Sequence, residues 1–345
     1  MATASAPAGT RPAGILRQAI GWHRPLMIMV VAMAGVTLVS FAGVLFDDRV
    51  QMGVSPWEKP MKFGIAFVAY GLTLAWMLSL PHKGKRFTWW LGTVLALCGV
   101  LDVGVVLIQG ARGMFSHFNS SGDWGAELTQ TIFSIFVPLL MLANLILAIT
   151  LIVQRIGDKA TALAIRLAAF SSVAGMGLGL LISFNPEPMG GVYTDGNGNA
   201  VELAISHNVG IRDDTAVMPF TGWSSTGGDL RIPHFVGMHG MQVLLLLGLL
   251  LSLLAARVAW LRDERTRRSV VAVAGVGYAG LTALVTWQAL RGQSLIHPDA
   301  RTLATLGLIV VVVAAGMTAV HAVGKSRAKT AAAAEAEPAR ERELI

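Results

Sequence analysis

The sequence is poor in charged residues and in cysteine, and each shortage excludes a class of protein. Only 14% of its 345 residues are charged, whereas 54% are hydrophobic. A soluble domain carries about 25% charged residues, so this composition indicates an integral membrane protein. The single cysteine, Cys98, excludes an internal disulfide framework, a cysteine-based zinc cluster and a c-type haem site, which needs two cysteines.

The familiar catalytic signatures are also missing. The sequence has no Walker phosphate loop, no Gly-x-Ser-x-Gly motif and no His-Glu-x-x-His motif. Its net charge of +7 comes from basic residues that are spread over many loops rather than gathered in one segment. We therefore expect no nucleic-acid partner. The sequence predicts that the protein lies in a lipid bilayer.

Long apolar runs are abundant. Eight of them are long enough to cross about 30 Å of hydrocarbon, so we expect an all-α fold of eight transmembrane helices. The first run is too long for the apolar part of a signal peptide, and we expect it to be an uncleaved helix. The predicted spans are residues 26–46, 61–80, 88–108, 129–153, 162–183, 234–256, 269–290 and 302–323.

The distribution of charge predicts the orientation of these spans. If the N-terminus is cytoplasmic, 19 of the 27 basic residues lie on the cytoplasmic side, but only 7 of the 20 acidic residues do. Basic residues favour the cytoplasmic side of a membrane. The sequence thus predicts a bacterial inner (plasma) membrane protein with both termini in the cytoplasm and one large connection, residues 184–233, outside it.

Two pairs of similar phrases predict an internal repeat. "QGARG" (109–113) ends the third span and "QALRG" (288–292) ends the seventh, both on the outer side. "EKPMKFG" (58–64) opens the second span and "DLRIPHFVG" (229–237) opens the sixth. Four spans return the chain to its starting side, so the two copies are expected to be parallel, related by an axis along the membrane normal.

The expected organisation follows from this repeat. Residues 15–160 form the first four-helix repeat, and residues 161–324 form the second, with the connection 184–233 inside it. Residues 1–14 are rich in alanine, proline and glycine and are expected to be a disordered tail. Residues 325–345 are expected to be a charged, alanine-rich cytoplasmic tail that is partly helical.

The repeated Arg-Gly pair has a structural interpretation and a functional one. A cation in the last turn of a helix complements the helix dipole, and a glycine beyond the end takes the left-handed conformation. This capping accounts for Arg112 and Arg291 without any ligand. Capping does not account for Gln109 and Gln288, which precede the arginines. A ligand site would account for them.

Cations also stand where the helix dipole disfavours them. Lys59, Lys62, Arg231 and His234 all lie near the N-termini of the second and sixth spans. A negative group must compensate for them. It is either a set of carboxylates from the protein, such as Glu58 and the aspartates nearby, or an anionic ligand.

Two ionisable residues are expected at the same depth in the membrane. Asp102 lies seven residues before the end of the third span, about 10 Å deep, and His239 lies six residues into the sixth, about 9 Å deep. Gln242 shares the helix face of His239. Ionisable residues inside a membrane are functional by default, although a pair between Lys62 and Asp102 would explain the carboxylate structurally.

The leading hypothesis is an outward-facing polar pocket that binds, and in a stronger version transports, a small anionic solute or a lipid headgroup. Arginine suits carboxylate or phosphate recognition, and an Asp102–His239 pair would link binding to protons. No cofactor is required. The expected ligand-binding residues are Lys59, Lys62, Asp102, Gln109, Arg112, His117, Arg231, His234, His239, Gln242, Gln288 and Arg291.

Two further hypotheses involve a cofactor. A metal-dependent membrane enzyme would use zinc, bound by three ligands that leave a position open for water. Its ligands would come from His117, His234, His239, His297 and Asp102. A haem b protein would need paired axial histidines, of which His239 is one. The segment "VYTDGNGNAVEL" (192–203) is typical of a hairpin turn and lacks the glycine and glutamate of a calcium-binding loop.

Overall fold

The computed structural model describes residues 21–343, and the side chains of residues 21–334. Within this range eight helices are long and apolar enough to span a membrane, and each is built around one of the eight apolar runs. The prediction of eight helices is therefore confirmed, while the predicted tail 1–14 lies outside the described residues. The helices are α2 (Arg24–Phe46), α3 (Glu58–Ser79), α4 (Lys85–Arg112), α5 (Trp124–Ile152), α6 (Lys159–Ser183), α7 (Arg231–Leu254), α8 (Glu264–Leu290) and α9 (Ala300–Glu343).

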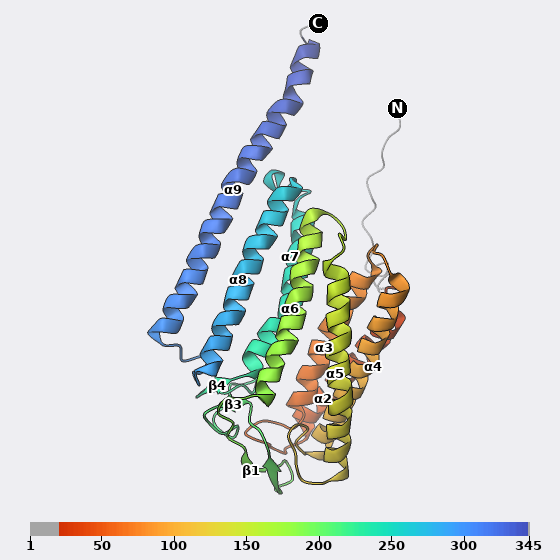
Figure 1. Ribbon diagram of the computed structural model, residues 1–345, viewed down its shortest axis with the longest axis vertical. Helices are drawn as coiled ribbons and strands as arrows, with labels where there is room; N and C mark the ends of the chain where they lie inside the picture. Colours follow the sequence, from red (N-terminus) through yellow and green to blue (C-terminus); the bar gives the residue numbers. More distant parts are fainter. Residues whose placement is uncertain (1–20, 344–345) are drawn as a thin grey trace.

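The helices pack in the same order in both halves of the chain (Figure 1). In the first half α2 packs against α3 and α4, α3 against α4, and α4 against α5. In the second half α6 packs against α7 and α8, α7 against α8, and α8 against α9. The halves meet where α5 packs against α6 and where α3 touches α7.

The helix pairs α2–α3 and α6–α7 cross at glycines. In both α3 and α7 the third residue is a proline and the seventh is a glycine. A Cβ on Gly64 of α3 would lie 2.5 Å from Oγ1 of Thr37 in α2, and a Cβ on Gly237 of α7 would lie 2.6 Å from Cα of Gly175 in α6. Only a glycine permits such close packing, so the shared proline–glycine spacing positions the N-termini of α3 and α7 in the same way.

The core lies between the helices and includes one polar chain that joins the two halves. Large apolar side chains such as Leu95 and Leu147 are fully buried there. The Tyr70 hydroxyl donates to the Asn144 side-chain oxygen (3.0 Å), and the Asn144 amide donates to Ser172 (3.3 Å). Because these residues belong to α3, α5 and α6, the chain of hydrogen bonds ties the first half to the second.

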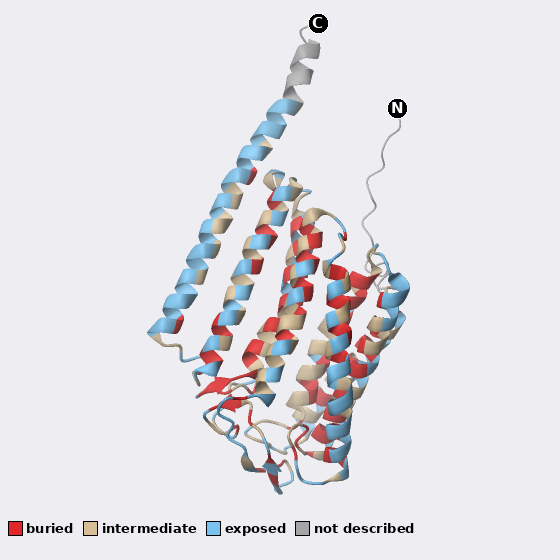
Figure 2. Ribbon diagram, in the orientation of Figure 1, coloured by how far each residue is buried: buried red, intermediate tan, exposed pale blue. Residues whose placement is uncertain are grey.

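Helix α9 differs from α5, which occupies the corresponding place in the first half. α5 is covered by α4 on one side and α6 on the other, whereas α9 packs against α8 and a short 3₁₀ helix, η1 (Ala259–Leu261). Figure 2 shows residues 300–334 of α9 largely exposed. The helix also continues to Glu343, through the segment that was predicted to be a charged tail from residue 325.

The chain has two distinct ends. The loop end carries the long connection with its strands, and the tail end is the opposite one, where α2 begins and α9 finishes (Figure 1). The strands form two small antiparallel sheets of two strands each. These are β1 (Gly191–Thr194) with β2 (Ala200–Leu203), and β3 (Asn208–Val209) with β4 (Gly228–Asp229).

The predicted hairpin at 192–203 is confirmed. Asp195 begins its turn, and the Asp195 carboxylate accepts the backbone N–H groups of Asn197 and Asn199, both at 2.8 Å. Such bonds are typical of an aspartate-stabilised turn. The hairpin packs through Tyr193 and its neighbours on β2 against Phe115 of the α4–α5 connection.

Candidate functional site

Both Gln-x-x-Arg-Gly phrases end a helix in the same way. Gly113 and Gly292 have positive φ angles of 71° and 67°. The N–H of each glycine bonds the carbonyl three residues back, and the next N–H bonds the carbonyl of the glutamine. This pair of bonds is a Schellman motif, which satisfies the last carbonyls of a helix. The repeated phrase is thus a helix-ending motif at the loop end of α4 and of α8.

The glutamines of these phrases belong to the same motif. Gln109 and Gln288 are buried, with exposed fractions of 0% and 3%. The Gln109 side-chain amide donates to the carbonyl of Phe115 (3.4 Å), and that of Gln288 donates to the carbonyl of Ser294 (2.8 Å). In both cases the acceptor lies six residues further along. Each glutamine therefore holds the chain that leaves its helix.

The arginines pair with the aspartate that opens the next helix. Arg112 makes two hydrogen bonds with Asp123, at 2.7 and 2.8 Å, and lies 4.4 Å from the Trp124 ring centre. The bond with Arg112 lowers the pKa of Asp123 to about 2. Arg291 likewise pairs with Asp299, whose carboxylate caps the first turn of α9 at Thr302.

The structure does not bring Arg112 and Arg291 together. Each is engaged with the aspartate before the helix that follows, α5 in one case and α9 in the other. Asp102 is also apart from them. It is buried in α4 beside Cys98, and its Oδ1 atom has no hydrogen-bond partner among the described residues. Lys62 does not pair with it.

The cations that open α3 and α7 are compensated by nearby carboxylates, with one exception. Lys62 pairs with Glu58 at 3.3 Å, and Arg231 pairs with Asp229 at 2.6 Å. His234 instead bonds the backbone carbonyl of Gly175 through Nδ1, at 2.8 Å. The same short loop accepts from both halves, because Lys62 also donates to the carbonyl of Thr221 (2.9 Å) and Arg231 to that of the following residue, Gly222 (2.8 Å).

Lys59 is the exception. Within the part of the chain that the structure describes, its ammonium group makes no hydrogen bond and no ion pair. Protein surrounds the side chain, which is half-buried. The charges of Lys62, Arg231 and Asp213 all act on it. An ammonium group in such surroundings is expected to have an anionic partner.

His117 lies next to Lys59. Its ring packs 4.6 Å from the Phe133 ring of α5 and 6.2 Å from the Phe63 ring of α3, measured between ring centres. Burial holds the pKa of His117 well below its usual range, and the charge of Lys59 lowers it further. These surroundings favour the neutral form of His117.

An oriented histidine–aspartate pair comes from the long connection. The backbone N–H groups of His207 and Asn208 both donate to the Asp213 carboxylate at 3.0 Å, and the His207 ring bonds it through Nδ1 at 2.6 Å. Although burial opposes ionisation, the interaction with His207, through its side-chain and backbone hydrogen bonds, and the charge of Arg231 keep the pKa of Asp213 below its usual range. Nδ1 of His207 is then the donor, which leaves Nε2 as an acceptor.

The remaining predicted residues extend the cluster along α7. Phe235 lies 6.5 Å from Phe63 of α3 and 6.3 Å from His239, between ring centres. His239 bonds the Gln242 side chain at 3.3 Å. A continuous set of rings thus leads from His117 across the junction of the halves to His239.

The structure therefore divides the predicted residues into three groups. We call the group at the junction of the halves the junction cluster. From the sequence prediction it contains Lys59, Lys62, His117, Arg231 and His234, and further along α7 also His239 and Gln242. The structure adds His207 and Asp213. The helix-ending residues Gln109, Arg112, Gln288 and Arg291 form two separate motifs. Asp102 lies by itself.

Sequence reasoning missed His207 and Asp213. They lie six residues apart in a connection without regular periodicity, so neither the hydropathy nor a repeat indicates them. The one available signal is a histidine and an acid close together in the long loop, "HNVGIRDD" (207–214).

The residues proposed for a metal site are not assembled. Among the described residues no group of three or more His, Cys, Asp or Glu side chains is placed to hold a metal ion. His297 is exposed and bonds the carbonyl of Ser225 (3.0 Å), and His234 is engaged with α6. The donor set thus gives no support to the zinc hypothesis.

Comparisons with protein-family models, with curated proteins and with solved structures each gave no match. The function is therefore argued from the residues of the junction cluster.

Proposed function

We propose that the protein is a multi-pass membrane protein that binds a small anionic solute or a lipid headgroup in the junction cluster. The observation that carries this proposal is Lys59. The three carboxylates of the junction, those of Glu58, Asp229 and Asp213, pair with Lys62, Arg231 and His207, and none of them pairs with the ammonium group of Lys59. A carboxylate or phosphate group of a ligand would supply the missing negative charge.

We further propose that the chain lies in the bacterial plasma membrane with the tail end in the cytoplasm and the loop end outside. The excess of basic residues on the tail side supports this orientation. Cysteine labelling tests it, because the only native cysteine is fully buried. A cysteine at Thr194 should react with a membrane-impermeant maleimide in intact cells, and one at Ser326 only after the membrane is permeabilised. The opposite pattern would reverse the orientation.

The two halves, in this proposal, are parallel repeats of one four-helix unit. The shared packing order, the proline–glycine spacing of α3 and α7 and the matched helix-ending motifs all support it. A junction between repeats is a common place for a solute site in transporters. Here the junction holds unlike residues: Lys59 comes from the first half and Arg231 from the second.

Binding should be linked to protons. With its histidines neutral, the cluster contains three cations (Lys59, Lys62 and Arg231) and the carboxylates of Glu58, Asp213 and Asp229, so its formal charge is zero. An anion that enters would favour the protonated form of His117 and His207. This linkage replaces the Asp102–His239 pair that the sequence suggested, because α4 and α7 have different principal neighbours. Transport would be a further property of the same site.

The experiment that tests the proposal is a thermal-unfolding screen of the detergent-purified protein. Succinate, inorganic phosphate and glycerol phosphate are the anionic probes, and choline is the cationic control. We expect at least one anion to raise the unfolding temperature in a saturable way, since a ligand that binds only the folded state stabilises it. A response to choline equal to that of the anions would contradict the proposal.

A second candidate function is catalysis by His207. Donation of Nδ1–H to Asp213 at 2.6 Å fixes the ring and leaves Nε2 free to accept a proton, which is the arrangement of an oriented general base. His207 Nε2 would take a proton from a water molecule whose oxygen forms a bond to the phosphorus of a phosphate ester held by Lys59; the bond from phosphorus to the ester oxygen would break, and His207 would return the proton to the departing alcohol oxygen. Turnover of a bound anion by the wild type, lost in Asp213→Asn while binding is kept, would favour this function over simple binding.

A further inference from the structure

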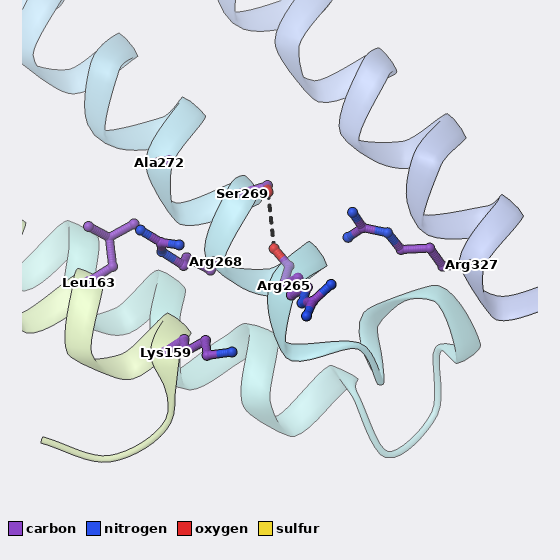
Figure 3. Close-up of a pocket in the computed structure, with 7 residues that line it drawn as sticks. All are labelled: Lys159, Leu163, Arg265, Arg268, Ser269, Ala272 and Arg327. Atoms are coloured by element: carbon purple, nitrogen blue, oxygen red, sulfur yellow. Dashed lines mark hydrogen bonds between the residues drawn. The ribbon is translucent and has the colours of Figure 1, made fainter. Parts of the chain in front are cut away.

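A second site lies at the tail end, far from the junction cluster. A pocket of about 420 Å³ opens there among α6, α8 and α9. Pockets of 300–1,000 Å³ are typical of sites for small molecules. Figure 3 shows the side chains around it: Arg327 of α9 extends toward Arg265 of α8, whereas Arg268 extends toward Leu163 of α6, the helix that also carries Lys159. The lining residues are Lys159, Leu163, Arg265, Arg268, Ser269, Ala272 and Arg327.

The pocket has four cations and little to neutralise them. Among residues 21–334 the side-chain nitrogens of Lys159, Arg265 and Arg268 make no hydrogen bond and no ion pair, and Arg327 pairs with Asp263 at 3.1 Å. No carboxylate lines the pocket.

The carboxylates nearby are occupied in holding helix ends. Asp158 caps α6 and pairs with Arg267, and Asp263 caps α8 and pairs with Arg327. Glu264 accepts the backbone N–H of Lys159. These contacts fix the frame of the pocket but leave three of its cations without a partner.

The local helix geometry adds to the positive potential. Lys159 is the first residue of α6 and Arg265 is the second of α8. The N-terminus of a helix carries a partial positive charge and favours an anion, so these positions are unfavourable for cations unless an anion joins them. Three independent chain segments thus direct positive charge at one recess.

The other side of the pocket is apolar. Leu163 and Ala272 line it one turn or two further along α6 and α8. Beyond them Phe170 and Val276 are exposed by 63% and 62% on the same two helices. Along α6 and α8 the basic pocket is therefore followed by exposed apolar surface. A phospholipid needs this order, because its phosphate binds cations and its acyl chains contact apolar side chains.

We propose that this pocket binds the phosphate headgroup of an anionic phospholipid, with Lys159, Arg265, Arg268 and Arg327 around the phosphate and the acyl chains along α6 and α8. Basic recesses between helices at the cytoplasmic surface suit such headgroups. The proposal depends on membrane insertion with the tail end in the cytoplasm, and it is independent of the ligand of the junction cluster.

Native mass spectrometry of the detergent-purified full chain tests the proposal. Phosphatidylglycerol should bind at least about tenfold more tightly than phosphatidylcholine, because charge-assisted hydrogen bonds are worth about that factor. Inorganic phosphate at millimolar concentration should not displace the lipid. Equal binding of the two lipids would overturn the proposal, and displacement by phosphate would identify a site for a soluble anion instead.

A matched pair of variants locates the site. The double variant Arg265→Gln with Arg268→Gln should lose the preference for phosphatidylglycerol. The control, Arg155→Gln with Arg262→Gln, removes the same charge from exposed positions at the same end and should keep the preference. Equal loss in both would show that only the general charge of this end attracts the lipid and would also overturn the proposal. The comparison of lipids with the wild type holds even if the double variant does not fold.

Discussion

Two sets of basic residues lie at the loop end, and they differ in their surroundings. Arg112 and Arg291 each have an aspartate and an aromatic ring as partners. Lys59 lies at the junction, enclosed by protein, and has no such partner among the described residues. The first set is repeated in the chain and the second is not.

The comparison shows which residues the two matched halves share. Each half must end its third helix and start its fourth, so both keep the glutamine, the arginine and the glycine that make this turn. A ligand site formed once, between the halves, needs no such symmetry. In the proposed repeat the matched glutamine, arginine and glycine thus build the fold. Lys59 matches Ile232 when Pro60 and Pro233 are aligned, so its charge belongs to one half alone and is the candidate for function.

Removal of the Lys59 charge should have the largest effect. We expect Lys59→Met to weaken binding of the anion found in the thermal screen by roughly 10- to 100-fold, because a hydrogen bond to a charged group contributes about 1.5–3 kcal/mol. Isothermal titration of purified protein measures it. Lys83→Met, which removes the same charge from an exposed position at the tail end, is the matched control and should bind normally. Unchanged affinity in Lys59→Met would remove the junction cluster from consideration.

The affinity for that anion should fall as the pH rises. Burial and the charge of Lys59 lower the pKa of His117 in the free protein, and a bound anion should raise it. Binding then takes up a proton, so affinity decreases by up to about tenfold per pH unit for each linked histidine between the two pKa values. Titrations from about pH 5 to about pH 8 measure the slope.

The variant His117→Gln should flatten that pH dependence, whereas His297→Asn, at an exposed histidine of the same end, should leave it unchanged. An affinity that does not vary with pH in the wild type would show that the histidines stay neutral in the complex.

The two helix-ending glycines offer a smaller, graded test of the repeat. Alanine at Gly113 or Gly292 must adopt a positive φ, which costs on the order of 1 kcal/mol of unfolding free energy. At Gly113 the new Cβ would also lie 2.6 Å from Nη1 of Arg49, whereas at Gly292 nothing comes closer than 3.5 Å. We expect Gly113→Ala to lower the unfolding temperature more than Gly292→Ala. The reverse order would mean that the two turns are not equivalent.

The smallest effect is expected from the repeated arginines. Arg112→Ala and Arg291→Ala should each lower the free energy of unfolding by about 1 kcal/mol or less, because their ion pairs are partly exposed. Anion affinity should not change. A loss of binding in either variant, with the fold intact, would restore the ligand role that the sequence suggests for these arginines and would end the distinction between the two sets.

Much of the fold could be predicted from the sequence because hydropathy and length determine it. The positions of the polar helix ends were predicted less accurately. Helix α4 continues to Arg112, beyond the apolar run, because the Schellman motif stabilises its last turn. Residues beyond 325 form helix because their alanine-rich composition favours it regardless of charge.

The candidate site could be predicted only in part. Lys59 and Arg231 were found because cations at helix N-termini conflict with the dipole. His207 and Asp213 were not, because the path of the long connection depends on tertiary contacts such as those of Asp213 with the backbone of residues 207 and 208. The structural role of Gln109 likewise depends on a carbonyl six residues away that no periodicity reveals.

Thr221 and Gly222 give the junction a mechanical property. Their adjacent carbonyls hold Lys62 of α3 and Arg231 of α7 at the same time. A rotation of one half against the other must therefore stretch or exchange one of these two bonds. Any rearrangement of the halves would change the contacts of this dipeptide, which Lys62 reaches from a position one helical turn after Lys59 on α3.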